Sequence, residues 1–302
     1  MCHSREVSTS PKDFAFDVVV VGSANLDLVA TLDHLPKPGE TIVALGYAEH
    51  AGGKGVNQAV ACARMGARTA FVGCVGNDDA GLFLRGVLEN EGIDTTMLRV
   101  VDMPTGRAFI NVDSRGENEI VVVSGANTQV GVAQNPFLLP TSHVLLMQLE
   151  IPLQTVTAAL TAARKGGAVT LLNPAPYRSL TGEILSLVDV IVPNEMESAA
   201  CGGTQALLAA GVGTVVTTLG ERGAVINTAS SETSISPHNV VAVDTVGAGD
   251  AFIGALSAEI ARGASISEAA AVGAVAGALA TTVRGAVPSL PTQTSVRSAM
   301  NK

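Results

Sequence analysis

The chain has 302 residues, of which 47% are hydrophobic and 15% are charged, and its formal net charge is −9. This length accommodates one large α/β domain or two smaller ones, and the composition excludes an intrinsically disordered chain. The acidic balance provides no overall positive field for nucleic acid, so an anionic ligand would have to be held by local groups such as backbone amides, a metal ion or a few cations.

Cysteine spacing and hydrophobic runs favour a protein of the cytoplasm with no membrane partner. The four cysteines, at positions 2, 62, 74 and 201, form no CxxC pair and are expected to be reduced. No apolar run reaches membrane-spanning length, and residues 1–15 lack the hydrophobic core of a signal peptide. We therefore expect a flexible extension over 1–15 and one folded domain over 16–302.

Strand and helix patterns alternate along most of the chain. The run DVVVVG at 17–22 has no polar alternation and predicts a strand buried on both faces. Further strands are predicted at 69–75, 144–148, 168–173, 188–193, 214–218 and 224–227, and helices at 55–65, 80–91, 153–165, 195–202, 204–210, 250–262 and 267–283. This order predicts a parallel sheet with helices on both faces, which is a three-layer αβα domain.

Two segments interrupt this alternation, at about 25–52 and 105–124. Residues 26–50 alternate weakly between apolar and polar, and 106–124 contains two strand-like runs around the turn DSRGEN, which is typical of a hairpin. Both predict short antiparallel strands with one solvent-exposed face. The resulting small β layer is either a lid over a site or a peripheral sheet without motion.

The motif DTVGAGDAFIGA at 244–255 leads from a β segment, predicted at 240–243, into a helix. Backbone amides of Gly247, Ala248 and Gly249 can face an anion at the positive end of that helix. Asp250 is placed to accept a proton from a substrate hydroxyl while these amides stabilise a phosphoryl group. The alternative is that Asp250 is simply the N-cap of the helix.

Two glycine-rich stretches do not complete common nucleotide motifs. GAGDAF lacks the last glycine of GxGxxG, because Phe252 occupies that position. Lys54 is followed by Gly55 instead of the Ser or Thr of a phosphate-binding P-loop. The sequence therefore supports neither a dinucleotide-dependent dehydrogenase nor a P-loop nucleotidase.

Two further motifs provide polar groups suited to a sugar. AGGKGVNQAVACARMG at 51–66 places Lys54 and Asn57 on a glycine turn and the start of a helix, although a capped helix with a surface lysine would look the same. GSANLD at 22–27 follows the first strand, where Asn25 and Asp27 would point the same way and could bind a vicinal diol. The alternative for this pair is an Asx turn.

These motifs occur in the order and spacing of the ribokinase (PfkB) family of carbohydrate kinases, which the chain resembles from about residue 17 to 292. MQLE (147–150), NPAP (173–176), PNEMES (193–198) and TLGERGA (218–224) add to the resemblance. It implies a ribokinase-like, Rossmann-like αβα fold with a small β-sheet lid. It also implies ATP-dependent phosphorylation of D-ribose at O5, with Asp250 as general base and the amides of Gly247, Ala248 and Gly249 as an anion hole.

The resemblance also assigns binding residues. The sugar would be held by Asn25, Asp27, Gly53, Lys54, Gly55, Asn57, Glu150 and Asp250. The nucleotide would be held by Asn194, Thr218, Leu219, Gly220, Glu221, Arg222, Gly223, Gly249 and Ala274, where Ala274 replaces a polar residue of some relatives. That replacement puts a side-chain contact in doubt but not the use of ATP.

Two metal sites follow from the same resemblance. Glu197, with Asn194, would order Mg²⁺ largely through water, and the same two residues also fit a capping box. An activating K⁺ would be bound by Asp244, Val246, Ala280, Val283, Gly285 and Ser289, mostly through backbone carbonyls.

The resemblance further implies a homodimer formed through the lid strands. Alternatives to D-ribose as the substrate are deoxyribose, fructose or a nucleoside, each acted on by another kinase of the family. An alternative from a different class is a non-catalytic sugar-binding regulator.

Overall fold

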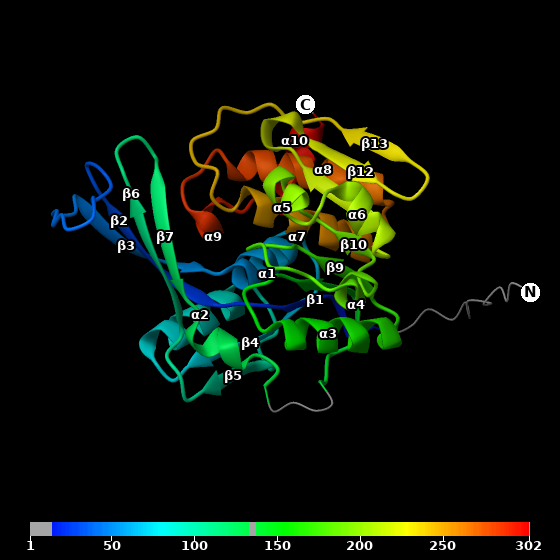
Figure 1. Ribbon diagram of the computed structural model, residues 1–302, viewed down its shortest axis with the longest axis horizontal. Coiled ribbons are helices and arrows are strands. Elements are labelled where there is room, and N and C mark those ends of the chain that lie inside the picture. Colours follow the sequence, from blue (N-terminus) through cyan, green and yellow to red (C-terminus); the bar gives the residue numbers. More distant parts are fainter. Residues whose placement is uncertain (1–13, 133–136, 302) are drawn as a thin grey trace, which may run out of the picture.

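The computed structural model describes residues 14–132 and 137–301. A nine-stranded sheet in the order β13-β12-β11-β10-β9-β8-β1-β4-β5 forms its centre (Figure 1). Its strands are β1 (Phe16–Val21), β4 (Thr69–Gly76), β5 (Leu98–Val101), β8 (Ser142–Met147), β9 (Val169–Leu172), β10 (Val190–Ile191), β11 (Thr214–Thr218), β12 (Ala224–Asn227) and β13 (Glu232–Ile235). The predicted extension at 1–15 lies almost wholly outside the described residues.

The sheet is parallel from β11 through to β5 and antiparallel at its other edge, where β11 pairs with β12 and β12 with β13. The predicted parallel sheet is therefore correct for seven strands and wrong for the edge. An antiparallel edge on a mostly parallel sheet is common, because tight turns such as 228–231 can connect only antiparallel neighbours.

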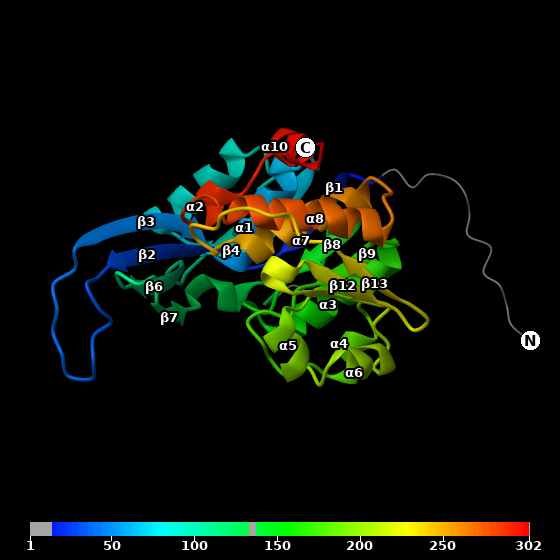
Figure 2. The ribbon, with the colours of Figure 1, turned by 90° about the horizontal axis from the view of Figure 1, so that it is seen from above.

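Helices cover both faces of the sheet, as the unbroken valine run predicted. Val18 and Val20 of β1 belong to one apolar cluster, and Val19 and Val21 belong to the other. The first cluster includes α1 (Lys54–Arg64), α2 (Asp79–Asn90), α7 (Ala248–Ala261), α8 (Ile266–Ala280), α9 (Ala286–Ser289) and α10 (Gln293–Met300). The second includes η1 (Gly125–Gln129), α3 (Leu153–Gly166), α4 (Gly182–Leu185) and α6 (Thr204–Ala209), with α5 (Glu195–Ala200) beside them (Figure 2).

A second sheet, in the order β3-β2-β6-β7, extends from one side of the central layers (Figure 1, Figure 2). It consists of β2 (Asn25–Thr31), β3 (Gly46–Gly52), β6 (Gly106–Val112) and β7 (Asn118–Val123). Each inserted segment forms an antiparallel pair, as predicted, and the two segments join through parallel pairing of β2 with β6. Asn25 and Gly106 face each other at the start of that pairing, next to the main domain.

One prediction and one alternative for the C-terminal motif are wrong. Residues 240–243 form no strand, and Val241 is 86% exposed. The backbone N–H of Val243 donates instead to the carbonyl of Thr281, in the turn that ends α8. Asp250 is not an N-cap, because α7 begins at Ala248 with Gly247 as its N-cap, and Asp250 is the third helical residue. Within the described ranges, no helix combines the length and apolarity needed to cross a bilayer.

Candidate active site

The predicted sugar and phosphate residues meet at the carboxyl ends of β1, β8 and β9, where α1 and α7 begin. Asp250 is only 8% exposed there. Its carboxylate accepts one hydrogen bond from Asn57 Nδ2 and one from Gln58 Nε2, each at 2.9 Å. The Asp250 side chain is thus turned toward α1 instead of capping α7. It is a buried hydrogen-bond acceptor at the centre of the site.

The start of α7 has the geometry of an anion site. Gly247 is left-handed, with φ 80°, and a Cβ atom at this position would lie 3.2 Å from Ala286 Cα. Only glycine satisfies both conditions without strain. The first amides of a helix lack intrahelical acceptors and carry partial positive charge. Among the three predicted amides, that of Ala248 has a long internal bond of 3.3 Å to the Thr245 carbonyl.

Asn25 and Asp27 lie on β2 and share one face of the second sheet. Asn25 Oδ1 accepts a hydrogen bond of 2.7 Å from Asn127 Nδ2, and side chains at Gly52 or Gly106 would collide with Asp27 or Asn25, respectively. Burial, together with the negative charges of Glu150 and Asp250, raises the pKa of Asp27 to about 7. This carboxyl group can therefore exchange between donor and acceptor roles near neutral pH.

Glu150 and Lys54 connect the glycine turn to the end of β8. The Glu150 carboxylate accepts hydrogen bonds from the hydroxyl of Ser23 and from the backbone N–H of Lys54, the latter at 3.0 Å. Burial acts to lower the pKa of the Lys54 ammonium, but the carboxylates of Asp250, Glu150 and Glu197 outweigh it and hold this pKa above its usual value. Lys54 is thus a cation inside an acidic site.

Asn194 and Glu197 form a complete capping box at the start of α5. Asn194 Oδ1 accepts the N–H of Glu197 at 2.8 Å, and Glu197 Oε2 accepts the N–H of Asn194 at 2.9 Å. The capping alternative is therefore confirmed, and Glu197 keeps one carboxylate oxygen beyond it. Within 14–132 and 137–301, no three His, Cys, Asp or Glu side chains cluster as a metal cage. A Mg²⁺ ion that keeps most of its water fits this donor set, whereas a fully protein-bound ion does not.

The loop from Thr218 to Gly223 lies beside this helix start. Asn194 and Thr218 form an isolated β-bridge, and Arg222 Nη2 is 2.5 Å from Glu195 Oε2. Leu219, Gly220 and Glu221 are half-buried or exposed along the short 3₁₀ turn η2 (Gly220–Arg222). Arg222 is engaged with Glu195, so contact with a nucleotide would require it to leave or share this exposed ion pair. Ala274 is half-buried on α8 and packs against the core.

The six residues predicted to bind K⁺ lie on two segments that the structure joins. One is the loop at 244–246, and the other runs from the end of α8 through the following loop to the end of α9. The Asp244 carboxylate accepts the N–H of Val246 at 3.0 Å and the N–H of Gly285 at 2.8 Å. The Ala280 carbonyl accepts the N–H of Val283 at 3.3 Å, and the buried Ser289 hydroxyl donates to the Ala286 carbonyl at 2.8 Å. Asp244 therefore acts as an anchor between the loops through its side chain.

Five buried polar residues of the site had no predicted role: Ser23, Gln58, Asn127, Gln148 and Asn173. Four of them stand inside quoted motifs, so their positions could have suggested a role: Ser23 in GSANLD, Gln58 in GGKGVNQA, Gln148 in MQLE and Asn173 in NPAP. Asn127 follows the β6–β7 hairpin in a stretch without periodicity. It begins the polar run Asn127–Gln129 after Gly125 and Ala126, which does not distinguish it from an ordinary loop residue.

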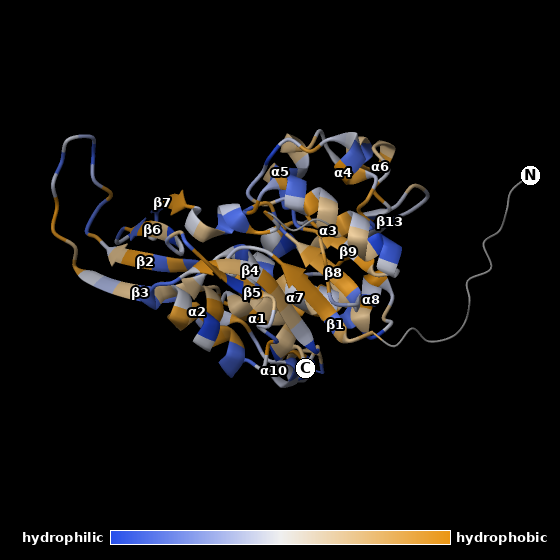
Figure 3. Ribbon diagram, turned by 90° about the horizontal axis from the view of Figure 1, so that it is seen from below, coloured by the Kyte–Doolittle hydropathy of each residue, from blue (hydrophilic) through white to orange (hydrophobic). Residues whose placement is uncertain are grey.

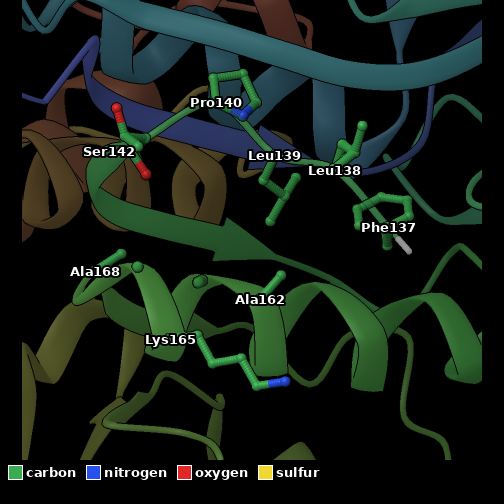
Figure 4. Close-up of a pocket in the computed structure, with 11 residues that line it drawn as sticks. Phe137, Leu138, Leu139, Pro140, Ser142, Ala162, Lys165 and Ala168 are labelled. Carbon is green, nitrogen blue, oxygen red and sulfur yellow. The ribbon is translucent and has the colours of Figure 1, made fainter. Parts of the chain in front are cut away.

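A cavity of about 280 Å³ lies at the amino ends of β8 and β9, at the opposite end of these strands from Asp250 (Figure 4). Phe137, Leu138 and Leu139 line it together with the end of α3. Its described lining includes one ionisable side chain, Lys165. This lining therefore provides no acid–base pair.

A doubly covered α/β sheet, a small second sheet and a buried acid at a glycine-rich helix start define a class of phosphotransferases. The chain belongs to the pfkB family of carbohydrate kinases, whose sequence model matches residues 15–293. It is 40% identical over 292 residues to ribokinase from Haemophilus influenzae, which covers 91% of this chain and 95% of that protein. The predicted family resemblance is thereby confirmed.

Solved structures agree with this assignment. Ribokinase from Thermotoga maritima superposes with a TM-score of 0.87 at 35% identity, covering 95% of this chain and 100% of that one. Ribokinase from Arabidopsis thaliana, complexed with ribose and ATP, superposes with a TM-score of 0.86 at 31% identity, covering 96% and 100%. The predicted αβα ribokinase-like fold with a small second sheet is confirmed.

Proposed function

We propose that this protein is an ATP-dependent kinase that transfers the γ-phosphoryl group of MgATP to O5 of D-ribose, giving ribose 5-phosphate and ADP. The observation that carries the proposal is the buried Asp250 carboxylate, held at the start of α7 by Asn57 and Gln58. The relatives named as ribokinases, and the relative that binds ribose and ATP, support the same activity.

The sugar would bind between the second sheet and the start of α1. Its hydroxyls would contact Asn25 and Asp27 on the second sheet. On the main domain they would contact Asn57, Glu150 and the Gly53–Gly55 turn, with the Lys54 ammonium nearby. Asn57 Oδ1 is buried and has no hydrogen-bond partner in the described part of the chain, so it is available as an acceptor. An uncharged polyol fits such a set, because a sugar lacking a matching hydroxyl would leave buried polar groups unpaired.

In the reaction, the Asp250 carboxylate would accept the proton of the sugar hydroxyl as its oxygen attacks the γ-phosphorus in line. The amides of Gly247, Ala248 and Gly249 would stabilise the negative charge on the phosphoryl group, helped by the dipole of α7. Mg²⁺ supplies charge neutralisation at the phosphates when bound, and Asn194 and Glu197 would hold it through water. Closure of the second sheet would exclude water and limit ATP hydrolysis.

The nucleotide would lie across Asn194 and the loop from Thr218 through Leu219, Gly220, Glu221 and Arg222 to Gly223, with Gly249 near its phosphates. Ala274 on α8 would contribute an apolar contact to the base in place of a polar one. K⁺ would bind between the two loops joined by Asp244, with carbonyls of Val246, Ala280, Val283 and Gly285 and the Ser289 side chain as ligands. Full activity in KCl and reduced activity in NaCl would support this site.

The second sheet, over about 25–52 and 105–124, would act as a lid and as a dimer contact. All six residues of β7 are exposed, including the consecutive apolar residues Ile120, Val121, Val122 and Val123. Figure 3 shows this strand in the colour of hydrophobic residues. Such a strand requires a cover in a stable protein. A monomeric mass in light scattering would contradict the homodimer.

The free thiols of Cys62, Cys74 and Cys201 fit the reducing conditions of the cytoplasm.

A coupled assay of ADP release over a sugar panel tests the proposal. We expect D-ribose to give the highest kcat/KM, above 2-deoxyribose, fructose and nucleosides. Preference for another sugar would reassign the substrate within the family. Absence of ADP release with every sugar, in the presence of MgATP and KCl, would instead indicate a non-catalytic sugar-binding protein.

A further inference from the structure

Gln58 is at the centre of a buried amide network behind Asp250. Its Nε2 donates to Asp250 Oδ1 at 2.9 Å and to Asn173 Oδ1 at 3.1 Å, and its Oε1 accepts Gln148 Nε2 at 2.5 Å. Gln58 and Gln148 are fully buried, and Asn173 is 5% exposed. The network thus connects the starts of α1 and α7 to the ends of β8 and β9.

The direction of every amide in this network follows from two acceptors that cannot donate. An ionised Asp250 offers only oxygen, so Gln58 must present its NH₂ group there. Its Oε1 then faces Gln148, which must donate in turn. At the other end, Asn173 Nδ2 donates to the Val192 carbonyl at 2.9 Å, which turns Asn173 Oδ1 toward Gln58. Each amide therefore has one orientation that satisfies its neighbours.

Gln148 keeps this orientation at a local cost. Its Oε1 is buried without a hydrogen-bond partner in the described residues. A flipped amide would place two oxygens against each other at Gln58, which is worse than one unpaired acceptor. The space for this amide exists because residue 22 is glycine, since a side chain there would collide with Gln148. Gln148 thus keeps the hydrogen bond that it donates to Gln58, although its own Oε1 atom is left without a partner in the described residues.

We propose that Gln58 is a positioning residue for the Asp250 carboxylate, and that Gln148 and Asn173 fix the orientation of the Gln58 amide. This inference rests on the proposed kinase function, in which Asp250 is the base. Each carboxylate oxygen receives one protein donor, from Asn57 or Gln58, so rotation of the carboxylate is restrained and its remaining lone pairs stay directed at the sugar. A general base must lie within hydrogen-bond distance of the proton that it accepts. A misoriented Asp250 carboxylate would therefore reduce turnover.

The test compares kcat and the sugar KM of Gln58→Leu, Gln148→Leu and the double variant. We expect Gln58→Leu to lower kcat by about 10- to 100-fold while the sugar KM stays within about twofold, because the groups assigned to sugar binding remain. Gln148→Leu should lower kcat by a smaller factor. In the double variant, Gln148→Leu should add no further loss, since its effect passes through Gln58.

Asn227→Leu is the matched control. Asn227 is a buried amide on β12, next to the edge strand β13, and donates to Glu232 at 2.8 Å, whereas Asp250 lies at the ends of central strands. It should lower the unfolding midpoint and leave kcat unchanged. Sugar binding by calorimetry shows whether each variant is folded at its site, and Gln58→Met replaces Gln58→Leu if the latter does not fold.

The outcomes separate the two proposals. A kcat for Gln58→Leu or Gln58→Met within twofold of the parent, or independent losses from Gln58 and Gln148, would overturn the positioning role. If neither Gln58 variant folds, an unchanged kcat for Gln148→Leu overturns it. A parent protein that releases no ADP with any sugar overturns the proposed function, whatever the variants do.

Discussion

Gly254 of α7 lies directly against Ala61 of α1, and this contact sets the distance between the two helices that form the site. A Cβ atom at Gly254 would lie 3.0 Å from the carbonyl carbon of Ala61 and would collide with the Ala61 methyl group. Gly254 is one helical turn after Asp250, and Ala61 is one turn after Asn57. The close approach is therefore what allows the side chains of Asn57 and Asp250 to reach each other.

Gly254→Ala should separate the helices and weaken the site. Overpacking of this kind costs about 1–3 kcal/mol of unfolding free energy, and the lost contact at Asp250 should lower kcat as well. Urea unfolding and steady-state kinetics measure the two effects. Gly86→Ala in α2 is the control, because a Cβ there meets nothing within 4 Å. That change should raise stability by about 0.5–1 kcal/mol without changing kcat, and equal behaviour of the two variants would contradict the close-contact argument.

Asp250→Asn should abolish most turnover while the protein stays folded. The substitution keeps the shape of the side chain and removes its ability to accept a proton, so kcat should fall by about 100-fold or more. Glu259→Gln provides a matched control on the same helix, since Glu259 is also buried and its carboxylate pairs with Arg262 and Arg297. The control should lower the melting temperature and preserve kcat. Near-normal turnover of Asp250→Asn would remove the base assignment.

The pKa of Asp27, raised to about 7, has a consequence for stability. Between the ordinary value of 3.8 and about 7, the folded protein binds a proton that the unfolded chain has released. The contribution of Asp27 is therefore most favourable below pH 4 and declines as the pH rises through 7. Asp27→Asn removes this penalty, so the variant should gain stability over the parent, and the gain should be larger at pH 8 than at pH 5.

Urea unfolding of the ligand-free protein at both pH values checks this. Asp33→Asn, on an exposed loop next to β2, should show no comparable gain. Sugar affinity of Asp27→Asn should fall at pH 8, where the lost carboxylate would have accepted sugar hydroxyl protons. An equal stability difference at pH 5 and pH 8 would show that Asp27 does not titrate in this window.

The sequence predicted the central layers because their signals are local. Four successive valines in β1 predict burial on both faces, and each glycine-rich motif predicts a turn at the start of a helix. It could not predict β5 and β13, which are short edge strands without clear alternation. The valine-rich segment 240–243 resembles a strand by propensity. Propensity does not show that the backbone N–H of Val243 donates to the Thr281 carbonyl instead of to a neighbouring strand.

The site could be predicted as a set of motifs but not as a network. Sequence spacing does not show that Gln58 meets Asn173 across 115 residues, or that Asp250 turns toward α1 instead of capping α7. The contact of Asp250 with α1 depends on how closely α1 and α7 approach, which in turn depends on Gly254 facing Ala61. The types of residue were therefore predictable, whereas their hydrogen-bond partners required the three-dimensional packing.

Glu197→Gln should separate the capping role of this residue from its proposed metal role. The helix start should lose up to about 1 kcal/mol of stability, because an amide is a weaker partner for the Asn194 N–H than a carboxylate. If Glu197 also orders Mg²⁺ through water, the Mg²⁺ concentration needed for half-maximal activity should rise severalfold at fixed ATP.

Glu268→Gln is the control, since Ser265 and Glu268 form the same capping box at the start of α8. Both variants should lose similar stability, and only Glu197→Gln should shift the Mg²⁺ dependence. A shift in neither variant would restrict Glu197 to its role as a cap.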